Sequence, residues 1–233
     1  MNIKEIIKYF KSVGTERNRQ GQARFGIDIS RSLGVSQPEI RSKAKEIKRN
    51  LSEKDRHGLA LKLWDLGYRE TMLLAAMIDV PELVTKKQMD KWVRDFNSWD
   101  VCDTTCGDLL DKTSFAVEKA LEYANSEKEF VKRTGFVLMA WLSVHNKELS
   151  NKIFVQFLKI IKNSADDERN FVKKAVNWAL RQIGKSRNVY LYKEALKVAD
   201  DLRGREGKTE RWVGSNAHNE LVTMEKKLSI QGD

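Results

Sequence analysis

The sequence predicts an all-α fold, arranged as an α-solenoid of helical repeats. Apolar residues recur at spacings of three and four along most of the chain, and no segment shows the two-residue alternation of a half-buried strand. Only two prolines interrupt the chain, Pro38 and Pro81, and each suits the first turn of a helix. The stretches between the periodic segments are short and rich in Gly, Asn, Ser and Asp, as expected for turns between helices.

The apolar periodicity defines thirteen expected helices. In chain order they span 3–12, 22–33, 38–49, 53–66, 69–79, 86–96, 99–111, 114–124, 127–144, 148–163, 168–183, 189–203 and 208–227. The first alternates charged and apolar residues like an amphipathic helix, which a secretory signal peptide does not. The longest wholly apolar run, 136–142, is far shorter than the roughly 20 residues that span a bilayer. We therefore expect a soluble, cytoplasmic protein that does not associate with membranes.

An internal repeat favours a solenoid over a simple helix bundle. The segments Glu129–Thr134 and Asn170–Ala175 match in pattern at an offset of 41 residues, a period typical of two-helix HEAT-like repeats. Stacked repeats of this kind curve and present a concave groove. In this register Arg133 and Lys174 occupy equivalent positions, so both cations would lie on one side of the array. We therefore expect a single HEAT-like repeat domain over residues 1–233, with a concave cationic groove.

The charge balance favours a polyanionic partner. The chain has 43 Lys and Arg against 33 Asp and Glu, a net charge of +10, which favours nucleic acid ahead of a membrane surface. Between 169 and 193 there are seven basic residues and no acidic one: Arg169, Lys173, Lys174, Arg181, Lys185, Arg187 and Lys193. A merely solvated helix surface usually mixes both signs. This stretch therefore predicts a face that contacts phosphates.

The sequence shows no pattern typical of a metal site. Cys102 and Cys106 lie four residues apart with no nearby histidine pair, which leaves too few ligands for zinc. The three histidines are scattered along the chain and form no constellation. We expect the cysteines to be reduced packing residues, and we expect neither a metal nor a cofactor.

Trp99 and Asp103 are four residues apart, so on a helix their side chains project from the same face, about one turn apart. A fixed carboxylate beside an aromatic ring suits a sugar that gains positive charge as its glycosidic bond breaks. The same residues are also explained as an acid favoured near the start of a helix and a tryptophan of the core. Spacing alone leaves both interpretations open.

Other aromatic and basic residues have comparable alternatives. Trp178 follows Lys174 at helical spacing, and it either contacts DNA or packs in the core. Arg133 lies among apolar residues and is also explained as a cation whose stem packs on an amphipathic helix, although its equivalence to Lys174 favours the groove. The tryptophans expected in the core are Trp64, Trp92 and Trp141.

Three segments in order, Ser98–Asp103, Lys132–Arg133 and Phe171–Arg181, resemble the AlkD-type DNA alkylation repair glycosylases. The similarity extends to Leu33–Arg41 and Leu63–Leu66. The fold of that family is a HEAT-like α-solenoid that holds duplex DNA in a cationic groove, in agreement with the fold predicted from periodicity. The resemblance implies hydrolysis of the N-glycosidic bond of N3- or N7-alkylated purines in double-stranded DNA. We expect a monomer, associated with the nucleoid when bound to DNA.

The resemblance also implies roles for individual residues. Asp103 would be the catalytic carboxylate, and Arg133 would hold a phosphate. Trp99 and Trp178 would flank the sugar and backbone of the lesion. An alkylated purine already carries positive charge and departs as a neutral base, so one carboxylate suffices and no general acid is needed.

Further DNA contacts are expected from basic residues of the carboxyl-terminal half and from one aromatic residue near the amino terminus. The candidates are Lys174, Arg181, Lys185, Arg187, Arg211 and Phe25. The arginines and lysines near turns and helix ends either contact phosphates or are solvated. Phe25 stands where the resembled family carries a tyrosine close to the lesion, so the hydrogen bond of that hydroxyl is lost.

Two alternative functions remain open: a non-catalytic protein that binds DNA structures on the same scaffold, and a solenoid that binds protein. The combination of Trp99, Asp103 and Arg133 favours an enzyme, because a protein that only binds DNA has no use for an anion facing phosphates. The acid-free stretch 169–193, in which all seven charged residues are basic, argues against the protein-binding alternative. The sequence therefore predicts a monofunctional alkylpurine DNA glycosylase that acts in base excision repair.

Overall fold

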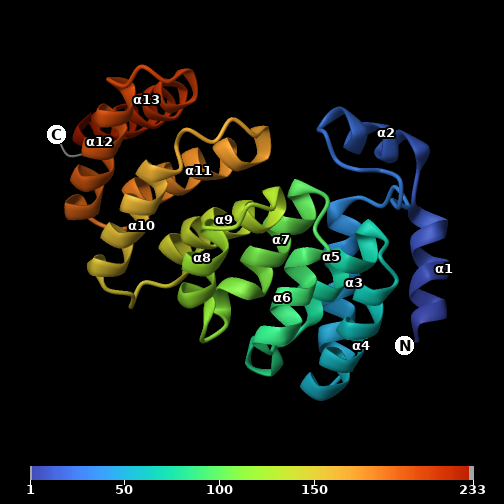
Figure 1. Cartoon of the computed structure of the whole chain (residues 1–233). Coiled ribbons are helices and arrows are strands. Elements are labelled where there is room, and N and C mark those ends of the chain that lie inside the picture. Colours follow the sequence, from blue (N-terminus) through green and yellow to red (C-terminus); the bar gives the residue numbers. More distant parts are fainter. Residues whose placement is uncertain (1, 231–233) are drawn as a thin grey trace. The chain divides into compact units, whose positions relative to one another are not determined.

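The computed structural model describes residues 2–230, with side chains described as far as residue 224. Within these residues, every assigned element of regular secondary structure is a helix, which confirms the all-α prediction (Figure 1). The chain divides into two compact units, residues 1–114 and residues 115–233, which are described separately below. Within the described residues, no helix combines the length and the apolar character that crossing a bilayer requires.

Over residues 2–114, the first unit contains seven α-helices and two short 3-10 helices. They are α1 (Ile3–Val13), α2 (Glu16–Arg24), α3 (Gln37–Asn50), α4 (Glu53–Asp65), α5 (Arg69–Ile78), η1 (Pro81–Leu83), α6 (Lys86–Arg94), α7 (Trp99–Asp108) and η2 (Leu110–Lys112). All residues of α5 are buried, because α3, α4 and α7 all pack against it. Trp64 and Trp92 stack in the same core with ring centroids 3.9 Å apart, as predicted for both.

Side chains that precede the helices account for several of their starting points. Asn2 forms a reciprocal capping box with Glu5 at the start of α1. Ser36, Ser52 and Thr85 each accept a hydrogen bond from a backbone N–H in the first turn of α3, α4 and α6. Each such cap stabilises its helix by about 1 kcal/mol, so these boundaries follow directly from the sequence.

In its described residues, the second unit contains six α-helices. They are α8 (Ala116–Ala124), α9 (Glu129–His145), α10 (Asn151–Asn163), α11 (Asn170–Ser186), α12 (Val189–Arg203) and α13 (Lys208–Ile230). Helix α9 packs on α8 and α11, while α13 packs on α11 and α12. Gly135 allows the close approach of α9 to α8, because a Cβ atom at this position would lie 2.4 Å from the backbone nitrogen of Ala124.

The internal repeat predicted from the sequence corresponds to two equivalent helices. Both repeat segments open helices of 17 residues, α9 and α11, and Phe130 and Phe171 contact each other with ring centroids 5.3 Å apart. The equivalent cations nevertheless differ in burial: Arg133 is 5% exposed, whereas Lys174 is exposed. Equivalent positions in the repeat therefore do not imply equivalent access to a partner.

The prediction of a helix over 22–33 is wrong. Helix α2 runs instead from Glu16 to Arg24, and Gly26 follows with a φ of +72° that ends it. A second left-handed glycine, Gly34, packs so tightly that a Cβ atom would lie 2.3 Å from the carbonyl oxygen of Thr15. The segment between the two glycines is therefore a loop. The other twelve helices agree with the predicted ranges to within about three residues at each end.

Candidate nucleic-acid interface

Helix α7 carries Trp99 and Asp103 on one face, as their spacing predicts, and both residues are partly exposed. The indole Nε1 of Trp99 donates a hydrogen bond of 2.9 Å to the backbone carbonyl of Phe25. The side chain of Phe25 is 74% exposed. Trp99, Asp103 and Phe25 are called the α7 surface below. It places an aromatic ring and a carboxylate beside a second, exposed aromatic residue.

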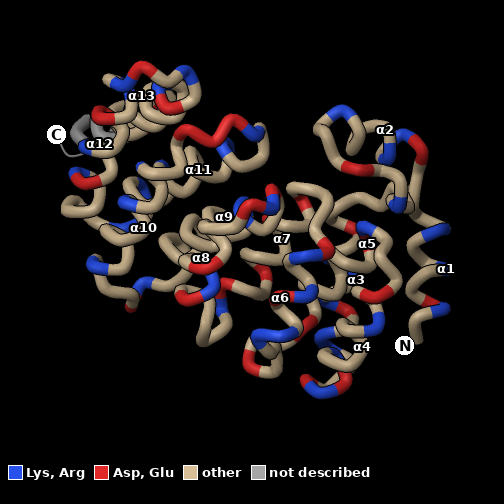
Figure 2. The backbone as a smooth tube through the Cα atoms, viewed as in Figure 1, with Lys and Arg blue, Asp and Glu red and all other residues tan. Residues whose placement is uncertain are grey.

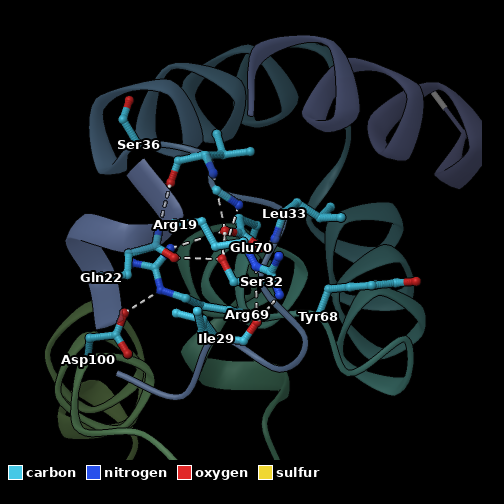
Figure 3. Close-up of polar contacts among 12 residues, drawn as sticks. Arg19, Gln22, Ile29, Ser32, Leu33, Ser36, Tyr68, Arg69, Glu70 and Asp100 are labelled. Carbon is cyan, nitrogen blue, oxygen red and sulfur yellow. Dashed lines mark hydrogen bonds and ion pairs between the residues drawn. The ribbon is translucent and has the colours of Figure 1, made fainter. Parts of the chain in front are cut away.

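A buried ion network holds the first turn of α7 (Figure 3). The carboxylate of Asp100 is 6% exposed and accepts hydrogen bonds of 2.6 Å from both the Ser98 hydroxyl and Arg69 Nε. A second nitrogen of the Arg69 guanidinium lies 3.3 Å from Glu70. These groups are protected from water, so each depends on its partners for stabilisation.

Glu70 extends this network to the loop that follows α2. Its fully buried carboxylate accepts hydrogen bonds from the Ser32 hydroxyl at 2.9 Å, the Leu33 N–H at 2.8 Å and the Val35 N–H at 3.3 Å. Figure 3 shows Glu70 close to Ser32 and Leu33, and Arg69 reaching toward Asp100. The network therefore ties the loop after α2 to α5 and to the start of α7, which positions two of the segments that form the α7 surface.

The two cysteines of α7 are free and buried, in agreement with their predicted packing role. Burial, followed by a hydrogen bond with Cys102, raises the pKa of the Cys106 thiol well above its ordinary value, so this thiol stays protonated and unreactive. Among the described residues, no group of His, Cys, Asp and Glu is arranged to hold a metal ion.

In the second unit, Arg133 of α9 is buried and supports α11. Its Nη1 donates a hydrogen bond of 2.6 Å to the carbonyl oxygen of Phe171, in the first turn of α11. Its contact with phosphate stays a prediction, and the guanidinium is already oriented by the neighbouring helix. The sequence predicts that Arg133 lies on the cationic groove, but it does not predict the hydrogen bond to the Phe171 carbonyl.

One face of α11 carries four of the predicted DNA-binding residues at helical spacing: Lys174, Trp178, Arg181 and Lys185. Lys174 is exposed, and Trp178 packs edge-on against Trp141 of α9 at 5.4 Å and 85°. Arg181 and Lys185 both form ion pairs with Glu220 of α13. Burial opposes ionisation of Glu220, but hydrogen bonds from Lys185 and Arg181 lower its pKa below the ordinary value.

Arg187 anchors a loop between helices. Its guanidinium donates hydrogen bonds of 2.7 Å to the carbonyl of Asn146 and 2.6 Å to that of Leu149, and it lies 4.4 Å from the ring centre of Phe154. Burial lowers the pKa of Arg187. This arrangement gives Arg187 a structural role whether or not it also contacts phosphate.

The acid-free stretch is partly neutralised by acids outside it. Asp167 pairs with Lys132 at 3.0 Å and with Arg169 at 2.6 Å. Burial opposes ionisation of Asp167, yet hydrogen bonds from Arg169 and Lys132 lower its pKa to about 2. Figure 2 shows basic and acidic residues interspersed over both units. Within the described side chains, the cations of this stretch without a carboxylate ion pair are Lys173, Lys174, Arg187 and Lys193, and of these Arg187 binds carbonyl oxygens instead.

Comparison with known proteins identifies the family. Residues 6–217 match the family described as DNA alkylation repair enzyme. The chain belongs to this family. A solved structure described as "A new family of proteins related to the HEAT-like repeat DNA glycosylases with affinity for branched DNA structures" has a TM-score of 0.80 at 20% identity, and the match covers 97% of this chain and 95% of that one. This likeness confirms the HEAT-like repeat fold. No curated protein sequence matches the chain.

In this DNA alkylation repair enzyme family member, the side chains of the α7 surface are accessible, because Phe25 is exposed and Trp99 and Asp103 are partly exposed. A cavity of about 790 Å³ lies between α1 and α4, and another of about 390 Å³ is lined by α3, α4 and the end of α7. Trp99, Asp103 and Phe25 line neither cavity. These three side chains therefore lie outside both cavities.

Proposed function

We propose that this chain is a monofunctional DNA glycosylase that hydrolyses the N-glycosidic bond of cationic N3- or N7-alkylated purines in duplex DNA. The observation that carries the proposal is the pairing of Trp99 and Asp103 on one partly exposed face of α7. Membership of the DNA alkylation repair enzyme family supports it. In this proposal the protein acts as a monomer on DNA in the cytoplasm.

In the proposed mechanism, Asp103 acts on the sugar. As the bond from C1′ to the purine nitrogen stretches, its electron pair leaves with the base, and the deoxyribose gains oxocarbenium character. The carboxylate of Asp103 stabilises that charge and orients or deprotonates the attacking water. The departing alkylpurine becomes neutral, so the α7 surface requires no general acid.

Trp99 and Phe25 shape the surface around the sugar. An indole ring presents an electron-rich face to a cationic sugar, and the hydrogen bond of Nε1 to the Phe25 carbonyl restricts its orientation. Phe25 has no hydroxyl group, so its contribution is apolar contact alone. Because these side chains are accessible at the surface, recognition would depend on the charge of the lesion more than on the size of the alkyl group.

The second unit supplies the proposed backbone contacts. Lys174 and Trp178 are positioned on one face of α11, where an ammonium and an aromatic ring suit a phosphate and a sugar. Arg133 is proposed to bind a phosphate with a guanidinium that the Phe171 carbonyl already orients. Arg181 and Lys185 would bind DNA only in competition with Glu220.

A non-catalytic protein that binds DNA structures is the second candidate. The structure with a TM-score of 0.80 is described as having affinity for branched DNA, and that observation favours this alternative. The deciding experiment incubates the protein with a duplex that contains one N7-methylguanine and with a four-way junction. Release of free N7-methylguanine supports the glycosylase. Tight binding of the junction without release of base from the duplex supports the alternative.

A further inference from the structure

The first four turns of α13 present an exposed stripe, and Arg211 is its only residue among the DNA contacts expected from the sequence. Its residues recur at spacings of three and four and are all exposed: Lys208, Arg211, Trp212, Ser215, Asn216 and Asn219. The stripe contains two cations, one large aromatic ring and three small hydrogen-bonding side chains. We call it the α13 stripe.

The acidic residues of this part of α13 are paired elsewhere. Glu210 binds Arg205 at 2.7 Å, and its side chain is 17% exposed. Glu220 binds Arg181 and Lys185 of α11. No other Asp or Glu occurs between residues 208 and 223. The outward face of these turns is therefore positive, although the helix itself carries carboxylates.

Trp212 is 41% exposed and lies beside a lysine of α11. The Nζ atom of Lys173 is 5.7 Å from the centre of the Trp212 ring. Within the described side chains, Lys173 has no carboxylate partner that would neutralise it. An exposed indole flanked by an available ammonium is thus a surface that accepts both a flat ring and an anion.

These features match the chemistry of single-stranded nucleic acid. Aromatic side chains stack on unpaired bases, while cations next to them follow the phosphates. Ser and Asn side chains can bind sugar, phosphate or base edges. A fully paired duplex keeps its base faces stacked on one another, so it would leave Trp212 without a ring to contact.

We propose that the α13 stripe, together with Lys173, binds a single-stranded DNA segment and stacks one unpaired base on Trp212. The inference rests on one part of the proposed function, which is that this protein binds DNA. It does not depend on glycosylase activity. It names a second DNA contact, in the second unit, for DNA that carries an unpaired strand next to a duplex.

Fluorescence anisotropy with the full chain tests the proposal, using a labelled blunt duplex and the same duplex with a single-stranded extension. The extension should increase the affinity of the unaltered protein by about tenfold, the gain typical of one stacked base. Trp212→Ala should remove this gain and leave the affinity for the blunt duplex unchanged. Trp212→Phe should retain much of the gain, and Lys173→Gln should reduce it.

Tyr190→Ala is the matched control. Tyr190 is 51% exposed on α12 of the same unit, with Lys193 one turn away. Its removal should change neither affinity. Thermal unfolding of each variant shows whether it is folded, and photocrosslinking from 5-iododeoxyuridine in the extension gives a readout that needs no variant. The crosslink should map to the peptide that contains Trp212.

The outcomes separate this inference from the proposed function. A gain from the extension that survives Trp212→Ala, or a crosslink elsewhere, overturns the inference. The inference also fails if the unaltered protein binds both DNAs equally, although DNA binding itself then stands. If the unaltered protein binds neither DNA, the inference and the proposed function both fail.

Discussion

Glu70→Gln tests whether the buried network holds the loop after α2 in place. The Glu70 carboxylate is fully buried and accepts hydrogen bonds from Ser32, Leu33, Val35 and Arg69. Glutamine keeps one acceptor oxygen but turns an NH₂ group toward N–H and O–H donors, and it removes one of the two carboxylates that pair with the Arg69 guanidinium. Breaking a buried ion pair by removing one partner costs about 3–5 kcal/mol, so we expect the free energy of unfolding to fall by that amount.

Urea denaturation measures the global loss, and amide hydrogen exchange measures the local one. The N–H groups of Leu33 and Val35 donate to Glu70, so their exchange should accelerate in Glu70→Gln. Glu46→Gln is the control, because Glu46 pairs with Lys43 but its own carboxylate is open to water, with the side chain 44% exposed. Such a pair contributes no more than about 1 kcal/mol. Equal losses in the two variants would refute the argument from burial.

Three further predictions concern catalysis, DNA binding and pH. Asp103→Asn should reduce excision of N7-methylguanine by roughly 10² or more and leave duplex binding intact. Asp108→Asn, at the end of the same helix, should leave excision unchanged. The unaltered protein should not release uracil or 1,N6-ethenoadenine, since no general acid assists the departure of a neutral base. Lys174→Gln should reduce the log–log salt slope of duplex affinity by about 0.9, and Lys185→Gln, which alters a cation that is already paired, by less. The pKa of Asp167 is about 2 in the folded protein, against an ordinary value of 3.8. This carboxylate should therefore contribute about 2 kcal/mol to the free energy of unfolding, a contribution that is present above pH 4 and lost as pH falls toward 2. In urea titrations at different pH values, Asp167→Asn should abolish this acid-dependent part.

The sequence predicts most of the fold because its helices combine apolar periodicity with side-chain caps. The predicted helix over 22–33 is the exception. Gln22 is the only buried residue of α2, so no apolar face in the sequence marks the position of this helix. The pairing of Trp99 and Asp103 follows from helical geometry alone. The network behind it does not, because Glu70 lies 37 residues from Leu33 and Arg69 lies 31 from Asp100. Contacts of this kind depend on tertiary packing, which local patterns do not encode.

In the second unit, ion pairs reduce the number of cations that are available to contact DNA. The acid-free stretch suggests seven phosphate-binding cations, yet Arg169, Arg181 and Lys185 are paired with carboxylates and Arg187 binds carbonyl oxygens. A paired cation must break its ion pair before it binds a phosphate, so its net gain from DNA is small. An exposed lysine such as Lys174 breaks no ion pair when it binds a phosphate, so it gains the full free energy of counterion release from the DNA. Affinity in this unit should therefore depend on a few exposed lysines and on aromatic contacts, and the contrast between Lys174→Gln and Lys185→Gln measures that difference directly.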